Sequence, residues 1–350
     1  MTLAQMKFLD KHLGWALCAS LSTVEWIVSA FRGSTRGASP GENPKILLVK
    51  FWGMGSIILG SPLLKAIRRK YPNASLQFLT LSRNREVLEL FPDVNRIHTL
   101  DIDRGLGAFL VSFLTMMSSL RAAKLDLVID QEFFTRFSAI VVYLTGARTR
   151  VGFKAWEKWR GNLHLVGVPY NRYWHVSRNF SNLCTAAGIP VPAEPELVRP
   201  VIREDQKALA DAILAGKGLT GGLYVCMNPN SGEIALTRRW PAPNFVELGK
   251  RLTREFPGLK LALIGSRAEK DYVGAIVRQI GHPAVVDLSG LLSVAQLAHV
   301  LGQSSLLITN DSGPLHLACA MDVPTLSFFG PETPVIYGPV GPKHVVFYKN

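Results

Sequence analysis

The longest run of residues suited to ligand chemistry is L-L-I-T-N-D-S-G-P-L-H-L-A-C-A, at positions 306–320. Its apolar beginning predicts a strand, and the D-S-G-P segment that follows predicts the start of a helix. Ser312 or Asp311 can cap that helix, while Gly313 lets a ligand approach the backbone closely. Unpaired N–H groups and the helix dipole then favour a pyrophosphate. The alternative is an ordinary capped helix in which His316 is structural.

Two more polar segments follow strand-like runs in the second half of the chain. N-P-N-S-G contains Asn228 and Ser231, and the nearby R-R-W-P contains Arg238. A polar turn beside guanidinium groups can neutralise phosphate charge, although a solvated loop has the same pattern. Glu269 in L-I-G-S-R-A-E stands just after a strand, where a carboxylate can accept both ribose hydroxyls. It can equally be a glutamate favoured by a helix start.

The first strand of the chain ends in K-F-W-G-M-G-S, which places Gly53 and Gly55 ahead of Ser56. Gly60 stands too late to be the third glycine of the G-x-G-x-x-G fingerprint, so the segment disfavours a dinucleotide oxidoreductase. After the fourth strand, Asp130 and Glu132 precede Arg136. These carboxylates could supply a general base, or they could form a salt-bridged surface turn.

Metal chemistry has little support in the sequence. The D-x-D spacing at residues 101–103 is found in metal–nucleotide sites, but no other ligands stand nearby in the sequence. The cysteines are far apart and form no C-x-x-C pair, which disfavours zinc ribbons, redox motifs and disulfide scaffolds and fits a reducing cytosol. They are Cys18, Cys184, Cys226 and Cys319. We therefore predict no metal site.

Composition narrows the class of protein and its partners. The chain has 350 residues, 48% of them apolar and 19% charged, which excludes global disorder and suggests two domains. Its net charge of +13 suits phosphorylated small molecules or anionic lipid. The basic residues are scattered in short groups, and no RNA-binding signature is present, so we expect no nucleic-acid partner.

From residue 45 onward, strand-like runs alternate with helical stretches, which predicts parallel α/β sheets with helices on both faces. In the first half we expect strands at 46–51, 75–80, 96–100 and 126–130, and helices at 57–71, 83–91 and 107–123. In the second half we expect strands at 223–227, 261–264, 285–286, 306–309 and 325–328, and helices at 244–256, 269–280, 293–302 and 315–321. Two Rossmann-like domains in tandem would bind ligands beyond the carboxyl ends of their strands.

The proline-rich segment 188–200 is the best domain boundary, which gives 1–43, 44–190 and 191–350. In the first of these, residues 13–31 are apolar but interrupted by Glu25, which disfavours a signal peptide or a membrane span. A helix in the membrane interface fits, with Trp15 and Trp26 as anchors; a helix packed on the protein's own core fits equally. Nearby cations are Lys7, Lys11, Arg32 and Arg36, and residues 33–44 read as a linker.

Together these segments resemble glycosyltransferase family 9, the ADP-heptose:lipopolysaccharide heptosyltransferase family, from about Lys45 onward. The most specific part is N-D-S-G-P-L-H-L-A-C-A, supported by N-P-N-S-G, R-R-W-P, L-I-G-S-R-A-E and G-M-G-S. The resemblance implies a GT-B fold, in which an acceptor domain and a donor domain face a central cleft. It also implies an inverting, metal-independent transfer, with ADP-heptose as co-substrate and no cofactor.

The resemblance also implies roles for residues. In the family, a lysine often stands near the donor phosphates at the position of Arg238, and an acid that binds the ribose stands at the position of Glu269. By position, Asp311, Ser312, Gly313 and His316 would belong to the donor-phosphate and sugar site. With the polar segments described above, the donor-side candidates are Asn228, Ser231, Arg238, Glu269, Asp311, Ser312, Gly313 and His316, and the acceptor-side candidates are Gly53, Gly55 and Arg136.

One departure concerns catalysis. The family usually has glycine then aspartate after the first strand, and that aspartate is its proposed base; here the pair is Gly55-Ser56. Serine cannot take a proton at neutral pH without a base beside it, so Glu132 or Asp130 would serve instead, with Ser56 positioning the acceptor.

Two classes of function therefore remain. The first is an inverting glycosyltransferase that moves heptose to a lipopolysaccharide-core or related surface glycan. It would work in the cytoplasm, on the inner face of the membrane, with a phosphorylated glycolipid acceptor and an anionic membrane surface as partners. The second is a non-catalytic nucleotide-sugar-binding or scaffold protein of the same fold.

Overall fold

A computed structural model of the chain describes residues 3–31, 41–154, 159–192, 194, 196–220 and 223–349. These form two compact units, Met1–Pro195 and Glu196–Asn350, and the division falls inside the proline-rich segment 188–200. Most of the predicted linker 33–44 lies outside the described residues, as do Arg32 and Arg36. The four cysteines are buried and free.

Unit 1 is built on a six-stranded parallel sheet with the strand order β3-β2-β1-β4-β5-β6. Its strands are β1 (Lys45–Val49), β2 (Ser75–Leu81), β3 (Arg96–Leu100), β4 (Leu127–Asp130), β5 (Thr149–Lys154) and β6 (Val166–Pro169). The first four match the apolar runs in the sequence, because a parallel sheet covered on both faces buries nearly every side chain of its inner strands. The last two had no such signal: T-R-V-G-F-K and V-G-V-P contain polar residues, glycine and proline.

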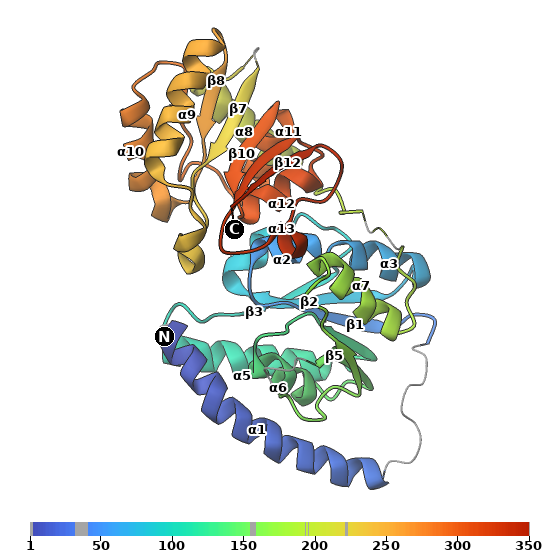
Figure 1. Cartoon of the computed structure of the whole chain (residues 1–350). Helices are drawn as coiled ribbons and strands as arrows, with labels where there is room; N and C mark the ends of the chain where they lie inside the picture. The colour runs from blue at the N-terminus through green and yellow to red at the C-terminus, as the bar shows by residue number, and fades with distance from the viewer. Residues whose placement is uncertain are drawn as a thin grey trace. The chain divides into compact units, whose positions relative to one another are not determined.

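The helices of unit 1 lie on both sides of this sheet (Figure 1). One side has α1 (Leu3–Phe31), α5 (Leu106–Ala122) and α6 (Arg136–Leu144); the other has α2 (Met54–Leu59), α3 (Pro62–Lys70) and α7 (Val176–Ala186). The predicted helix 57–71 is wrong as one element, because proline at 62 starts a new helix. The predicted helix 83–91 is only a 3₁₀ turn (Ser82–Asn84) and the single turn α4 (Arg85–Leu88).

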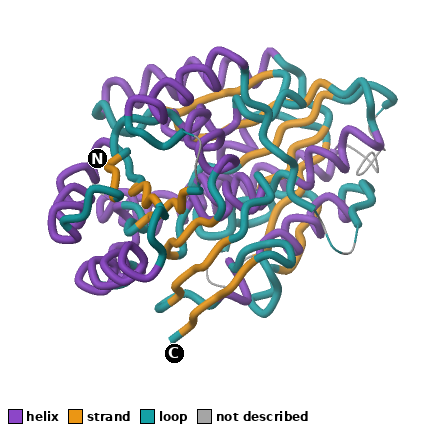
Figure 2. Tube along the Cα trace, turned by 90° about the horizontal axis from the view of Figure 1, so that it is seen from above, coloured by secondary structure: helices purple, strands orange, loops and turns teal. Residues whose placement is uncertain are grey.

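Unit 2 repeats the architecture, with the strand order β12-β11-β10-β7-β8-β9, all parallel. Its strands are β7 (Tyr224–Asn228), β8 (Lys260–Leu263), β9 (Val285–Asp287), β10 (Leu306–Asn310), β11 (Thr325–Phe329) and β12 (His344–Tyr348). Its helices are α8 (Glu204–Gly216), α9 (Ala242–Glu255), α10 (Lys270–Ile280), α11 (Val294–Gln303), α12 (Gly313–Ala320) and α13 (Pro334–Tyr337). Figure 2 shows strands and helices running alongside one another throughout the chain. The predicted α/β class with two Rossmann-like halves is confirmed.

Strand order places the predicted motifs. In each sheet the order reverses between the first strand and the fourth strand of its unit, at β1/β4 and β7/β10. Loops that leave neighbouring strands at such a switch point diverge, and a crevice forms at the carboxyl ends. Residues 50–56 and 131–136 follow β1 and β4, while 229–232 and 311–316 follow β7 and β10. The motifs of each unit therefore converge at its own switch point.

Candidate functional site

The switch point of unit 2 is held together by a buried polar network. The side-chain nitrogen of Asn228, at the end of β7, donates to Thr309 Oγ1 (2.9 Å) and to Ser312 Oγ (3.0 Å). Asn230 Nδ2 donates to the Ile264 carbonyl (3.0 Å), which connects the end of β8. Asn310 Oδ1 accepts the Trp240 N–H (2.9 Å). This network fixes the loops after three strands in one arrangement.

The start of α12 differs from the expected capped helix. Ser312 is the N-cap residue with an extended backbone, but its side chain makes no capping hydrogen bond. Its hydroxyl is instead 3.0 Å from Thr309 Oγ1. The first N–H groups of α12 are therefore not used by the N-cap side chain, which is the condition under which a helix start binds an anion. Gly313 begins the helix, and His316 is buried in its first turn.

Arg238 lies between two carboxylates at this site. Its Nη1 is 3.0 Å from Asp311 Oδ2, and its Nη2 donates to Glu332 Oε1 at 3.1 Å. Burial raises the pKa of Asp311 to about 6; the charge of Arg238 opposes this shift, and Glu332 adds to it. The sequence predicted Arg238 and Asp311 but missed Glu332, which follows β11 in the P-E-T-P segment. A partly exposed guanidinium beside a helix start can bind a diphosphate, provided that it exchanges these partners.

Glu269 has the contacts expected of a helix-start glutamate. Its Oε2 accepts the Ser266 N–H (2.9 Å) and the Ser266 hydroxyl (2.8 Å) in a capping box. Its Oε1 is 3.7 Å from Arg239 Nη2, and the Arg239 guanidinium stands 4.4 Å from the centre of the Tyr272 ring. Ser231 is buried in the loop after β7. Glu269 therefore has the helix-start role that the sequence left open as the alternative. Its Oε1 has only the longer contact with Arg239.

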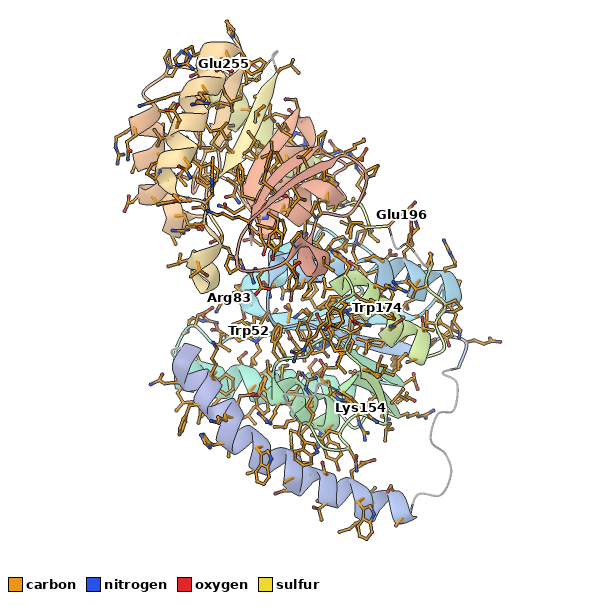
Figure 3. The ribbon with its side chains drawn as sticks, in the orientation of Figure 1. Trp52, Arg83, Lys154, Trp174, Glu196 and Glu255 are labelled. Atoms are coloured by element: carbon orange, nitrogen blue, oxygen red, sulfur yellow. The ribbon has the colours of Figure 1, made fainter. Side chains whose placement is uncertain are left out.

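In unit 1, the loop after β1 turns sharply into α2. Gly53 is the N-cap residue of α2 and has φ of 84°, a left-handed conformation that side chains rarely adopt. Gly55 is buried and Ser56 is half-buried in the first turn of this helix. Trp52 precedes the turn, and the guanidinium of Arg83 stands 5.9 Å from its ring centre (Figure 3). The turn thus presents Ser56 at the carboxyl end of the sheet.

Glu132, one of the two proposed bases, is fully buried beside this turn. Its Oε1 accepts three hydrogen bonds, from Lys50 Nζ (2.9 Å), the Phe51 N–H (2.7 Å) and the Trp52 N–H (3.0 Å). Its Oε2 has no hydrogen-bond partner among the described residues. Sequence reasoning missed Lys50, although a lysine directly after the apolar run at 46–49 was a usable signal.

Asp130, the other candidate base, is also fully buried but has more partners. Its Oδ2 accepts Ser138 Oγ (2.9 Å) and lies 3.0 Å from His164 Nε2, and its Oδ1 accepts the Glu132 N–H (3.0 Å). Burial alone would raise the pKa of Asp130, but the hydrogen bond with His164 and the charge of Arg160 outweigh it and lower this pKa. These contacts connect the end of β4 to Ser138 of α6 and to His164.

Arg136 and the D-x-D carboxylates also have internal partners. The Arg136 backbone N–H donates to Asp10 Oδ1 (2.7 Å), which connects α6 to α1, and the Arg136 Nε donates to the Trp159 carbonyl (3.1 Å). Asp101 pairs with Arg104, and Asp103 pairs with Arg83. Among the described residues, no group of three or more His, Cys, Asp or Glu side chains could hold a metal ion.

Known proteins share both the sequence pattern and the fold. Glycosyltransferase family 9 (heptosyltransferase) matches residues 113–350. The lipopolysaccharide heptosyltransferase 3 of Escherichia coli is 23% identical over 303 residues, which cover 84% of this chain and 86% of that protein.

Two solved structures are similar as well. The glycosyl transferase family 9 structure from Veillonella parvula has a TM-score of 0.78 at 21% identity, covering 90% of this chain and 88% of that one. The E. coli heptosyltransferase WaaC with ADP has a TM-score of 0.70 at 20% identity, covering 87% of this chain and 93% of that one. The family match extends over most of the chain, including all of unit 2, and the chain therefore belongs to glycosyltransferase family 9, the heptosyltransferase family.

Proposed function

We propose that the protein is an inverting glycosyltransferase that moves heptose from ADP-heptose to a lipopolysaccharide-core or related surface-glycan acceptor. The observation that carries this proposal is the switch point of unit 2, where Arg238 stands beside the uncapped start of α12. Such a site suits the diphosphate of a nucleotide sugar. Family membership supports the reaction class, and the names of similar proteins support heptose and ADP.

On the donor side, the charge of the leaving diphosphate is taken up without a metal ion or other cofactor. Arg238 and the N–H groups at the start of α12 stabilise the negative charge that develops on the phosphate oxygens. Asn228, Ser231, Ser312, Gly313 and His316 shape the phosphate and sugar pocket. Glu269 binds the ribose through Oε1, while Oε2 keeps its capping contact. Asp311 orients Arg238.

On the acceptor side, the acceptor hydroxyl attacks the anomeric carbon, the bond to the phosphate oxygen breaks, and the proton goes to a base. We assign the base to Glu132, because Oε1 is fixed by three donors while Oε2 accepts no hydrogen bond from the described residues. Asp130 is committed to His164 and Ser138 and would hold β4 in place. Ser56, Gly53 and Gly55 would position the acceptor. Arg136, which follows Glu132 by four residues in the sequence, stays an acceptor-side candidate.

The acceptor chemistry also suggests where the enzyme works. A phosphorylated glycolipid presents its sugar at a membrane surface, and the net charge of +13 suits an anionic surface. We place the enzyme in the cytoplasm, peripheral on the inner face of the membrane, with no nucleic-acid partner.

Donor binding is tested by calorimetric titration of the purified chain with ADP, with UDP and GDP as matched controls. We expect ADP to bind and the other two to bind at least about tenfold more weakly, a difference of about 1.4 kcal/mol. A preference for UDP or GDP would contradict the heptose donor, and binding of none would contradict the donor site itself.

The base is tested by turnover of ADP-heptose in Glu132→Gln and Ser56→Ala variants. Glu132→Gln should lower kcat by about 10²–10⁴-fold with an unchanged Kd for ADP, because proton transfer to a placed base contributes that much. Ser56→Ala should lower kcat much less. Melting curves control for the lost charge pair with Lys50. Unchanged kcat in a folded Glu132→Gln variant would sink the assignment of the base.

A further inference from the structure

Helix α1 is amphipathic in the opposite sense to a surface helix of a soluble protein. Its two acidic residues face unit 1: Asp10 lies 3.8 Å from Arg136, and Glu25 lies 3.2 Å from Arg150, with all four side chains largely buried. Gly14 and Cys18 lie on the same inward stripe. The inward stripe, which normally carries only apolar residues, therefore carries the helix's carboxylates as well as Cys18, which packs in a small apolar cluster.

The outward side of α1 is mostly apolar, although His12, Ser20 and Thr23 are also exposed on this helix. Its large exposed side chains include two tryptophans, which are 53% and 69% exposed, and these side chains are Phe8, Leu9, Leu13, Trp15, Leu17, Val24, Trp26 and Ile27. Trp159, itself 47% exposed, stands 6.2 Å from Trp15 between ring centres. Exposed apolar surface of this extent marks an interaction site, and tryptophan is enriched where one side of a contact is apolar and the other wet.

Helix α5, which also belongs to unit 1, has a second apolar stripe that faces outward. Its inward residues pack in the core, while an i, i+4, i+5, i+8 pattern of large apolar side chains stays 50–69% exposed. These are Leu106, Leu110, Val111 and Leu114. A helix that is apolar on all sides requires an apolar environment on its outer side too.

Helices α1 and α5 both contact Phe137 of α6. The Phe137 N–H donates to Asp10 Oδ1 of α1 (3.0 Å), and the Phe137 ring lies 6.5 and 6.2 Å from the rings of Phe109 and Phe113 of α5. Figure 1 shows α1 and α5 on the same side of the sheet, with α6 between α1 and the strands. The two apolar stripes therefore belong to one side of unit 1.

Charge identifies the occupant of this side. The acids of α1 are paired inward, whereas Lys7 and Lys11 are exposed on the same helix. Exposed cations also stand at the C-terminal end of α5, with Arg121 in its last turn and Lys124 after it; Arg104, before the helix, is exposed but pairs with Asp101. An apolar surface bordered by cations complements an anionic lipid bilayer, in which acyl chains bind the apolar side chains and headgroups bind the cations.

We propose that the outward stripes of α1 and α5 together form a docking surface for an anionic lipid bilayer, on which α1 lies flat. By length and composition, residues 7–30 of α1 could also cross a membrane. Crossing would break both buried ion pairs, which are roughly 22 Å apart along the helix, and would carry Asp10 and Glu25 into hydrocarbon. The proposal is independent of the sugar that the enzyme transfers.

The test is co-sedimentation of the full-length chain with vesicles of phosphatidylglycerol and phosphatidylethanolamine, compared with vesicles of phosphatidylcholine alone. We expect binding to the anionic vesicles that weakens as salt rises. The α1 variant Trp15→Ser with Trp26→Ser and the α5 variant Leu110→Glu with Leu114→Glu should each weaken it by about tenfold or more, since each removes two apolar contacts. The matched control is Leu209→Glu on α8 of unit 2, which is 52% exposed and should bind as the wild type does.

Each other result overturns a defined part of the proposal. Equal binding by the α5 variant would remove α5 from the surface, and equal binding to phosphatidylcholine would refute the role of charge. Protein that resists extraction by alkaline carbonate would indicate a spanning helix. A dimer that the same variants dissociate, without vesicle binding, would make a second copy the occupant. Quenching of wild-type tryptophan fluorescence by brominated phosphatidylglycerol tests the surface even if a variant fails to fold, and no quenching would contradict it.

Discussion

Asp311 shows how much a single residue's chemistry depends on its surroundings. The sequence placed this aspartate after a strand and before a helix, but any such aspartate would have the same pattern. The fold buries it beside Arg238 and near Glu332, and this burial raises its pKa to about 6. A carboxyl group with a raised pKa binds its proton more tightly in the folded chain than in the unfolded chain, where its pKa is about 3.9.

This difference predicts a pH dependence of stability. The contribution of Asp311 is most favourable when it is protonated and is lost as the pH rises from about 4 through about 6, because the folded chain must then hold a buried charge. In the Asp311→Asn variant this loss should disappear. Relative to the wild type, the free energy of unfolding of the variant should gain about 1–3 kcal/mol between pH 4.5 and pH 7.5 in urea titrations. A difference that stays constant over that range would refute the raised pKa.

At the scale of elements, α1 is held to the rest of unit 1 by polar contacts and by a small apolar cluster around Cys18. The buried pair of Glu25 and Arg150 fixes its C-terminal part, Asp10 fixes its N-terminal part, and Ser22 Oγ accepts the Asn162 N–H (3.1 Å). Of the two interpretations open from sequence, packing on the protein's own core is realised on one face of the helix. The other face is the exposed one for which we propose the membrane. The helix was predictable from its apolar run, but its orientation was not.

Breaking the buried pair should loosen the helix. Glu25→Gln removes the charge that faces the guanidinium of Arg150, and removal of one partner of a buried pair costs about 3–5 kcal/mol. Amide hydrogen exchange in α1 should therefore accelerate far more than exchange in β1 or β4. The control is Glu247→Gln, which breaks the exposed i, i+4 pair with Arg251 and should change stability by less than about 0.5 kcal/mol. Equal exchange in α1 of both variants would show that the buried pair does not hold the helix.

At the scale of the whole molecule, the proposed functional residues are distributed over two units. Each has its own sheet, core and switch point, and the proposed donor residues all lie in unit 2. The candidate base and the exposed helices lie in unit 1. A ligand that binds only the folded form of one unit stabilises that unit by an amount set by its concentration and affinity.

Donor binding should therefore be visible in unit 2 by hydrogen exchange. With ADP at about one hundred times its Kd, amides around 228–232 and 310–316 should be protected, with a gain of about 2.7 kcal/mol in the stability of unit 2. Amides of β1, β4 and α1 should exchange as they do without ADP, and GDP serves as the control nucleotide. Protection found in unit 1 instead would contradict the assignment of the donor side.

The sequence by itself determined the α/β class, the inner strands and the loops that carry the proposed site residues. The reason is that buried parallel strands, glycine turns and helix starts depend on neighbouring residues, so their patterns are local. Only the tertiary structure decided which charges are paired. Lys50 and Glu132 are 82 residues apart, and Arg238 and Glu332 are 94 apart. Such pairs form because strand order brings distant loops to one edge of a sheet. The same holds for α1, whose apolar run was recognisable in the sequence. Which face of this helix remains exposed depends on the positions at which Arg136 and Arg150 pair with its two carboxylates.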